Sequence, residues 1–221
     1  MNVVEYFGPR VAKTKLSVDE TKSLEAICVP NNQHYNDRLV GYLKEEYGIL
    51  EELKDLSVYK TIINNVNNYI TQIDSGNYVR ILDQIPNNNF LEMTDAWYNE
   101  QKAMEHNPIH THITSADIVC VIFPKILLDN EIKYYENNEG SEQKGQLYFM
   151  YGEPEKNAFG RSGFSVVPEE GDMYIFPASL NHYTSPVLGK SVRFSISCNF
   201  SFTSLSKRAL GKVLSKKEKK F

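Results

Sequence analysis

Residues 192–197 read Val192-Arg193-Phe194-Ser195-Ile196-Ser197, an alternation of apolar and polar side chains. Because successive residues of a β-strand point to opposite sides, the pattern predicts a strand with Arg193 and Ser195 on one face. An arginine that faces the interior of a sheet needs an anionic partner, since an unpaired buried guanidinium is very costly. No nearby acid in the sequence is the obvious partner. The stretch therefore indicates either a bound carboxylate or an internal salt bridge.

Short runs rich in Val, Ile, Tyr and Phe precede this stretch, back to Gly76, with turns of Gly, Pro, Asn or acidic residues between them. Such runs are typical of strands. About eight of them predict an antiparallel sandwich or barrel, and a double-stranded jelly roll fits that number. The polar, acidic segment from Asn130 to Gly145 is expected to be a long surface excursion. The predicted strands are Tyr78–Leu82, Ala96–Ala103, Ile118–Phe123, Gln146–Tyr151, Phe164–Val167, Met173–Phe176, His182–Pro186 and Val192–Phe202.

The first third of the chain has helical patterns instead. Ser17 and Glu20 form a capping box, with serine at the N-cap and glutamate three residues later, before apolar residues at helical spacing. We expect a second helix from Asn36 to near Gly48, with Leu39, Val40, Leu43 and Tyr47 as its apolar face. A third helix is expected from about Leu56 to Ile73.

The expected fold class is therefore α+β, with N-terminal helices followed by a jelly-roll core. Residues 1–76 form the helical segment that packs on the core, residues 77–203 form the core, and residues 204–221 form a basic tail. From Ser206 to Phe221 the net charge is +6, which leaves −10 for the rest of a chain whose total is −4. Such a tail can touch nucleic acid or an acidic partner, but we favour a solvated terminus.

The composition is that of an ordinary soluble protein, with 41% hydrophobic and 24% charged residues. The longest apolar stretch, Ile118 to Pro124, is far too short to span a bilayer, and residues 1–5 do not resemble a signal peptide. Three cysteines imply no disulfide framework. We therefore expect a cytoplasmic protein with no membrane partner.

Three of the five histidines belong to one constellation, His110-Thr111-His112 and the distant His182. The preceding Asn107-Pro108 favours an extended backbone, which would point His110 and His112 to the same side. Two imidazoles on one strand and a third on another can form half of a metal's coordination shell and leave the rest open. That arrangement is typical of a catalytic metal, although hydrogen-bonded surface histidines would show the same spacing.

Other polar and aromatic residues on the predicted strands could line a pocket. Asn99 and Gln101 share parity with Trp97, so one side of that strand is partly polar, and Tyr148 is a further candidate. Packing is the alternative role for the two aromatic residues. His106 is expected at a rim, and His34 in a loop. No Walker loop, GxGxxG, CxxC pair or nucleophile elbow is present in the sequence.

Taken together, these motifs resemble the 2-oxoglutarate/Fe(II)-dependent oxygenases common in tailed phages. The resemblance covers roughly residues 95 to 202. A weaker resemblance covers Tyr35 to Gly41. Each motif alone is unspecific, but their combination is specific. The motifs are Trp97-Tyr98-Asn99, Asn107-Pro108-Ile109-His110-Thr111-His112, Gly171-Asp172-Met173-Tyr174-Ile175-Phe176-Pro177-Ala178-Ser179-Leu180-Asn181-His182 and Arg193-Phe194-Ser195-Ile196-Ser197-Cys198-Asn199.

The resemblance implies a double-stranded β-helix that holds Fe(II) in its mouth. His110 and His182 match the first and the distal metal ligand. Arg193 matches the arginine that grips the far carboxylate of 2-oxoglutarate, and Ser195 matches the hydroxyl that assists it. The rigid fork of arginine suits this task, because it can bind a carboxylate through two parallel hydrogen bonds. Asn99 and Tyr148 are further candidates for binding the cosubstrate.

The chain departs from the superfamily at one ligand, since His112 stands where the broader pattern has an aspartate or glutamate. His112 could bind the metal itself and make three neutral ligands. Alternatively, Asp117 could supply the carboxylate, although its strand parity would require a turn or a bulge. We favour His112, so the expected metal ligands are His110, His112 and His182.

The leading functional hypothesis is an Fe(II)- and 2-oxoglutarate-dependent dioxygenase that uses O₂ to hydroxylate a substrate, with succinate and CO₂ as coproducts. If the chain is encoded by a phage, the enzyme would act in the host cytoplasm. One alternative is a three-histidine cupin-type dioxygenase, which would not need the Arg193 and Ser195 pair. Another is a non-catalytic jelly roll, such as a virion component. No feature of the sequence identifies the substrate or the oligomeric state.

Overall fold

Two antiparallel sheets form the core of the protein in the computed structural model, which describes residues 8–36, 41–73, 91–127, 145–152, 162–187 and 189–204. The larger sheet has the strand order β1-β7-β4-β9-β3-β2, and the smaller sheet has the order β6-β5-β8. The strands of the larger sheet are β1 (Ala12–Lys15), β2 (Glu45–Gly48), β3 (Leu91–Gln101), β4 (Ile118–Leu127), β7 (Asp172–Pro177) and β9 (Val192–Phe202). The strands of the smaller sheet are β5 (Leu147–Met150), β6 (Gly163–Val166) and β8 (Asn181–Thr184).

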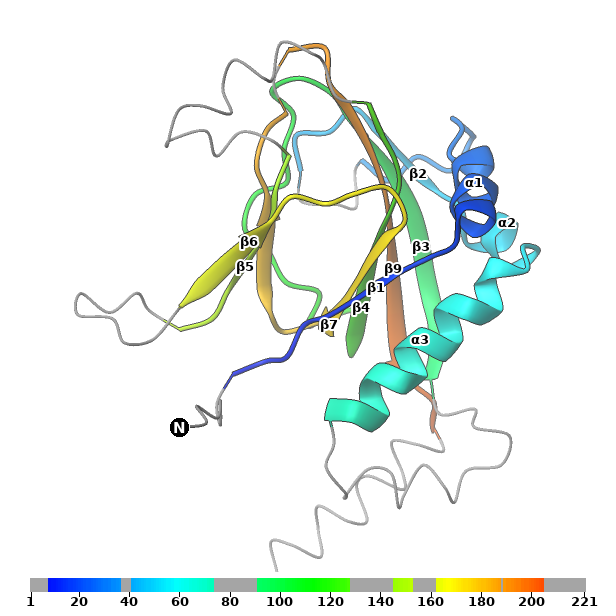
Figure 1. Cartoon of the computed structure of the whole chain (residues 1–221), viewed down its shortest axis with the longest axis vertical. Coiled ribbons are helices and arrows are strands. Elements are labelled where there is room, and N and C mark those ends of the chain that lie inside the picture. The colour runs from blue at the N-terminus through cyan, green and yellow to red at the C-terminus, as the bar shows by residue number, and fades with distance from the viewer. Residues whose placement is uncertain are drawn as a thin grey trace, which may run out of the picture.

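Three helices, α1 (Val18–Ile27), α2 (Leu50–Lys54) and α3 (Val58–Ile73), lie on one side of the larger sheet, and the smaller sheet lies on the other (Figure 1). This confirms the expected fold class of N-terminal helices followed by a jelly roll. The capping box of α1 is also confirmed, since Ser17 Oγ accepts the Glu20 N–H and the Glu20 carboxylate accepts the Ser17 N–H. None of the described helices is both long enough and apolar enough to cross a membrane.

The predicted helix from Asn36 to Gly48 is wrong. Residues 45–48 form β2, which pairs with β3 so that Tyr47 lies opposite Tyr98. Local apolar spacing suggested a helix, but hydrogen bonding to β3 and burial of Tyr47 against the helical layer favour a strand. The N-terminal segment is consequently not purely helical, because it also contributes β1 and β2 to the larger sheet.

Several sequence-based expectations fall outside the described residues. They include Leu39 and Val40 of the predicted second helix, the strand Tyr78–Leu82, and nearly all of the excursion from Asn130 to Gly145. The basic tail also lies outside, apart from its first residue. The boundaries of the three predicted regions stay predictions.

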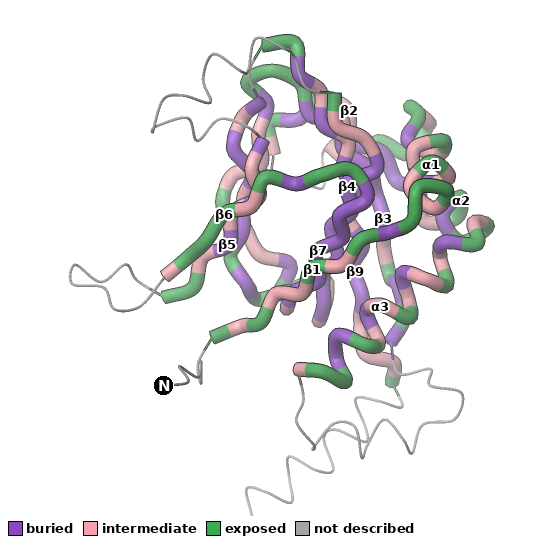
Figure 2. The backbone as a smooth tube through the Cα atoms, viewed as in Figure 1, coloured by how far each residue is buried: buried purple, intermediate pink, exposed green. Residues whose placement is uncertain are grey.

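The larger sheet separates two apolar clusters, because side chains alternate along its strands. On β4, Ile118, Cys120 and Ile122 pack in the helical cluster, whereas Val119 and Val121 pack toward the smaller sheet. Figure 2 shows the resulting burial along β3, β4, β7 and β9, in contrast with the exposed β6. The side that faces the smaller sheet contains the candidate site.

A β-bulge in β3 changes which residues face that interior. The pairing with β9 shifts between Met93 and Asp95. Met93 packs in the helical cluster before the bulge, and Ala96 does so after it, so the parity of the strand is reversed. The bulge thereby turns Asp95, Trp97 and Asn99 toward the interior.

Candidate active site

His110, His112 and His182 come together at one end of the interior. Their potential ligand atoms all lie within 4.8 Å of one another. The segment of the first two histidines runs beside β8, where His110 and His182 exchange both backbone hydrogen bonds at 3.0 and 3.1 Å. The His112 N–H donates to the Ala178 carbonyl at 2.8 Å. These backbone bonds hold the three rings in one cluster.

Two of the rings have a defined tautomer because their Nδ1 atoms face backbone carbonyls. His110 Nδ1 lies 2.7 Å from the Pro108 oxygen, and His182 Nδ1 lies 2.9 Å from the Leu180 oxygen. A carbonyl oxygen can only accept, so each Nδ1 carries the proton and each Nε2 keeps its lone pair for a metal.

Burial also keeps the imidazoles neutral. It lowers the pKa of His110, and it lowers the pKa of His112 to about 4 and that of His182 to about 3, with neighbouring histidines adding to the last two shifts. Neutral imidazole is the form that binds a transition metal. The donor set therefore fits a divalent metal such as Fe(II).

The structure places His112, and not Asp117, beside the other two histidines. The His112 ring stacks on His182 with a centroid distance of 5.2 Å and on Trp97 at 5.8 Å, so it lies inside the cluster. Asp117 instead accepts the Phe202 N–H at 2.9 Å and does not line the cavity. Among the described residues, the histidines are the only group that could hold a metal, so the carboxylate alternative has no geometric support.

The three histidines line a cavity of about 320 Å³. Polar side chains of β2, β3 and β9 form another part of its wall. In the pairing of these strands, Glu46 lies opposite Asn99, and Asn99 lies opposite Ser195. Arg193 is two residues from Ser195 on the same face. The alternation predicted for residues 192–197 is thus present in β9, and it turns Arg193 and Ser195 into the cavity.

Arg193 is only 3% exposed, and no described acid forms an ion pair with it. Its Nη1 donates to the Gly145 carbonyl at 2.6 Å, its guanidinium lies over the Phe123 ring, and its Nε has no partner. Burial lowers its pKa to about 9, so the group is still charged at neutral pH. Of the two sequence-based possibilities, a bound anion fits better than an internal salt bridge.

Ser195 and Asn99 are also buried in the cavity wall, and Asn99 Nδ2 donates to Ser195 Oγ at 3.4 Å. Tyr148 requires a correction, because it does not line this cavity. On β5 the buried residues are Leu147 and Phe149, and alternation places Tyr148 on the opposite face, where it stacks on Tyr183 at 4.5 Å.

Of the remaining candidate residues, Trp97 lines the cavity and the others lie outside it. The Gln101 amide donates to the backbone carbonyls of Glu105 and Ser185 and holds two loops together. His106 packs on Tyr42, and His34 packs on Tyr47. Neither of these histidines belongs to the cluster.

Sequence reasoning missed Tyr35, Glu46 and Asp95, which all line the cavity. The Tyr35 hydroxyl donates to Asp95 Oδ1 at 2.7 Å, and its ring stacks on Trp97. Glu46 was missed because residues 36–48 were predicted as a helix. Asp95 was missed because the bulge that turns it inward leaves no clear pattern in the sequence.

Residues 95–199 match the family model described as "Putative 2OG-Fe(II) oxygenase". The matched segment contains the three histidines, Arg193 and Ser195. This segment of the chain is therefore similar to the 2OG-Fe(II) oxygenase family.

Solved structures similar to this chain share its fold at low sequence identity. A prolyl-4-hydroxylase from Pseudomonas putida has 14% identity and a TM-score of 0.53, with 86% of this chain and 92% of that chain covered. The viral collagen prolyl hydroxylase of Paramecium Bursaria Chlorella virus-1, solved as a 2OG complex, has 10% identity, a TM-score of 0.50, and coverage of 86% and 94%. HygX from Streptomyces hygroscopicus, solved with iron bound, has 11% identity, a TM-score of 0.50, and coverage of 89% and 83%. A comparison with curated protein sequences gives no match.

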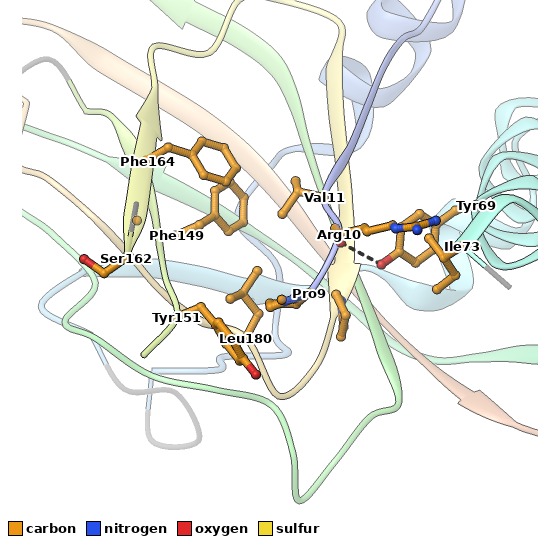
Figure 3. A pocket seen from close by; sticks show the side chains of 13 residues that line it. Pro9, Arg10, Val11, Tyr69, Ile73, Phe149, Tyr151, Ser162, Phe164 and Leu180 are labelled. Carbon is orange, nitrogen blue, oxygen red and sulfur yellow. Dashed lines mark hydrogen bonds between the residues drawn. The ribbon is translucent and has the colours of Figure 1, made fainter. Parts of the chain in front are cut away.

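The protein also has a larger cavity, of about 810 Å³, that the three histidines do not line. Figure 3 shows that Pro9, Val11, Phe149, Phe164 and Leu180 form the apolar part of its wall, and the Tyr69 hydroxyl donates to the Arg10 carbonyl. It contains none of the clustered histidines. The smaller cavity is therefore the candidate active site, since it alone joins the histidine cluster to the buried arginine.

The buried Glu46 predicts that the stability of the protein depends on pH. Burial, with a smaller contribution from Glu105, raises its pKa from 4.5 to about 7. Because the folded state holds this proton more tightly than the unfolded state, stability is lost as pH rises from about 4.5 through about 7. We expect Glu46→Gln to unfold at a higher denaturant concentration than the wild type at pH 8. The advantage should shrink by up to about 1.4 kcal/mol per pH unit below pH 7. A constant difference between pH 5 and pH 8 would contradict this prediction.

Proposed function

We propose that this protein is an Fe(II)- and 2-oxoglutarate-dependent dioxygenase that hydroxylates a substrate. The proposal rests on one observation: a cluster of three buried neutral histidines shares a cavity with a buried arginine that has no acidic partner among the described residues. The histidines would hold the metal, and Arg193 with Ser195 would hold the far carboxylate of 2-oxoglutarate. Relatives of the same fold were solved with iron or with 2OG, which is consistent with both assignments.

Each side chain would have a definite task. The Nε2 atoms of His110 and His182 face away from their carbonyl partners and are free to bind the metal, and His112 would complete the set. Arg193 Nη1 donates to the Gly145 carbonyl, which fixes the orientation of the guanidinium group. Its Nε has no partner among the described residues and would donate to a carboxylate. Val121, Phe123 and Leu147 line the same cavity and would exclude water from the reacting groups.

When bound, Fe(II) with 2-oxoglutarate and O₂ supplies the oxidation: R–H, 2-oxoglutarate and O₂ become R–OH, succinate and CO₂. One oxygen atom of O₂ enters the hydroxyl group and the other enters succinate. The protein supplies binding, orientation and a shielded cavity. The phage context and the cytoplasmic location stay predictions.

The direct test is an anaerobic titration of the protein with Fe(II) and 2-oxoglutarate. We expect a weak visible charge-transfer band at about 500 nm that needs both additions, because chelation of a keto acid to Fe(II) produces it. A three-histidine dioxygenase without a keto acid would bind Fe(II) but give no 2-oxoglutarate-dependent band. A non-catalytic jelly roll would bind neither. Folded protein without the band would contradict the proposal.

The role of His112 gives a separate prediction. We expect His112→Ala to weaken metal binding by at least about tenfold, because one of three ligands is lost, and His112→Asp to restore part of it by supplying a carboxylate. Asp117→Asn is the matched control and should leave metal affinity unchanged, since Asp117 bonds to the Phe202 N–H. Calorimetric titration with Co(II) measures all three variants. Loss of metal binding in Asp117→Asn but not in His112→Ala would reverse the assignment.

A further inference from the structure

One wall of the candidate active site carries hydrogen-bond acceptors that have no donor. Glu46 Oε1, Asn99 Oδ1 and Asn107 Oδ1 are buried oxygens without a hydrogen-bond partner among the described residues, and all three residues line the cavity. Leaving a buried acceptor unpaired is costly, and most buried polar atoms in proteins are paired. Three such oxygens on one wall point to a ligand that donates hydrogen bonds.

The three oxygens are grouped by the geometry of β2 and β3. Glu46 is the register partner of Asn99, so their side chains are neighbours on the cavity face. A Cβ on Gly41 would lie 2.2 Å from Asn107 Oδ1 and 3.8 Å from Glu46 Oε1. Both oxygens therefore lie close to Gly41, and a side chain at that position would clash with Asn107 Oδ1.

The charge of this wall is negative above about pH 7, where Glu46 is ionised. Glu46 is only 1% exposed, and Asp95, held by the Tyr35 hydroxyl, contributes a second carboxylate to the cavity lining. Arg193 is the only arginine or lysine among the described residues that line the cavity, and the proposed function uses it for 2-oxoglutarate. An ionised Glu46 therefore has no cation of its own in the described wall.

We propose that the substrate is a cation that presents a primary ammonium group to Glu46, Asn99 and Asn107. This inference rests on the proposed function and names the substrate class for the same site. An ammonium group carries three N–H donors and one positive charge, which match three acceptors that include one carboxylate. A hydroxyl group offers one donor and no charge, and a quaternary ammonium offers charge without donors.

Trp97 provides a reporter for the test. It is the only tryptophan in the chain, it lines the cavity, and it stacks on Tyr35 and His112. Protein loaded with Zn(II) and 2-oxoglutarate would be titrated with n-butylammonium at about pH 8.5, where Glu46 is ionised. We expect a saturable change in Trp97 fluorescence. Tetramethylammonium and n-butanol should bind at least about tenfold more weakly.

Two matched variants complete the test. Glu46→Gln should weaken n-butylammonium binding by at least about tenfold, because it removes the charge but keeps the shape. Glu45→Gln makes the same change on the neighbouring residue, which lies on the helical side with Tyr47, and should bind as the wild type does. Equal binding by wild type and Glu46→Gln would overturn the inference, as would equal binding of n-butanol and n-butylammonium.

Failure of the inference can be separated from failure of the proposed function. The Fe(II) and 2-oxoglutarate band is measured on the wild type and on Glu46→Gln. A normal band in both, with no n-butylammonium response in the wild type, would reject the ammonium site and leave the oxygenase assignment standing. An absent band in the wild type would reject the oxygenase assignment and, with it, the claim that the bound amine is a substrate.

Discussion

Replacing His182 by alanine is expected to abolish 2-oxoglutarate turnover and to weaken metal binding by at least about a hundredfold. His182 contacts both other histidines of the cluster, with its ring centroid 4.3 Å from that of His110 and 5.2 Å from that of His112. Its Nδ1–H donates to the Leu180 carbonyl, which aims Nε2 toward the other two rings. The remaining histidines could not close the same coordination shell.

Metal affinity would be measured by Co(II) titration, and turnover by succinate formation. His34→Ala is the control, because His34 is exposed and packs on Tyr47 outside the cluster. Because His182 is buried, its replacement leaves a cavity, and circular dichroism would verify that the variant is folded. A folded His182→Ala variant that still consumes 2-oxoglutarate would contradict the metal-site assignment.

Replacing Arg193 by leucine is expected to raise the dissociation constant for 2-oxoglutarate by at least about a hundredfold, while metal affinity stays unchanged. Hydrogen bonds to charged groups contribute about 1.5 to 3 kcal/mol each, and a bidentate carboxylate contact contains two of them. Arg193→Lys should recover only part of the loss, because lysine keeps the charge but not the planar fork. Titration of the metal-loaded variants with 2-oxoglutarate gives both constants.

Arg10→Leu is the matched control, since Arg10 lines the larger cavity away from the histidines. Unchanged 2-oxoglutarate binding in Arg193→Leu would mean that another group holds the cosubstrate and would contradict the role of Arg193. Loss of metal binding in the same variant would mean that Arg193 supports the metal site rather than the cosubstrate. The two measurements therefore separate the role of the arginine from that of the histidines.

The larger sheet was largely predictable because its strands have strong local patterns. The alternation in residues 192–197 places Arg193 and Ser195 in the cavity and Ile196 in the helical cluster, as expected. The spacing of His110 and His112 predicted their convergence, and the structure brings them together with His182. In both cases the period of two residues in an extended backbone determines the direction of the side chain.

Other features depended on partners that are distant in the sequence. Residues 45–48 became a strand because β3 was available to pair with them, and this placed Glu46 in the cavity wall. The bulge after Met93 reversed the parity of β3 and turned Asp95 inward. Tyr148 faces away from the site because Leu147 and Phe149 occupy the buried face of β5.

The sequence by itself determined the strand alternation, the capping box of α1, and the residue types that can bind a metal and a carboxylate. Each of these follows from interactions within a few residues of chain, where backbone geometry sets the direction of the side chains. Only the tertiary structure decided that His182 lies beside His110, that His112 rather than Asp117 faces the cluster, and that Glu46 adjoins Asn99. Those relations depend on strand register, on a bulge and on burial, which arise when distant segments pair and exclude water together.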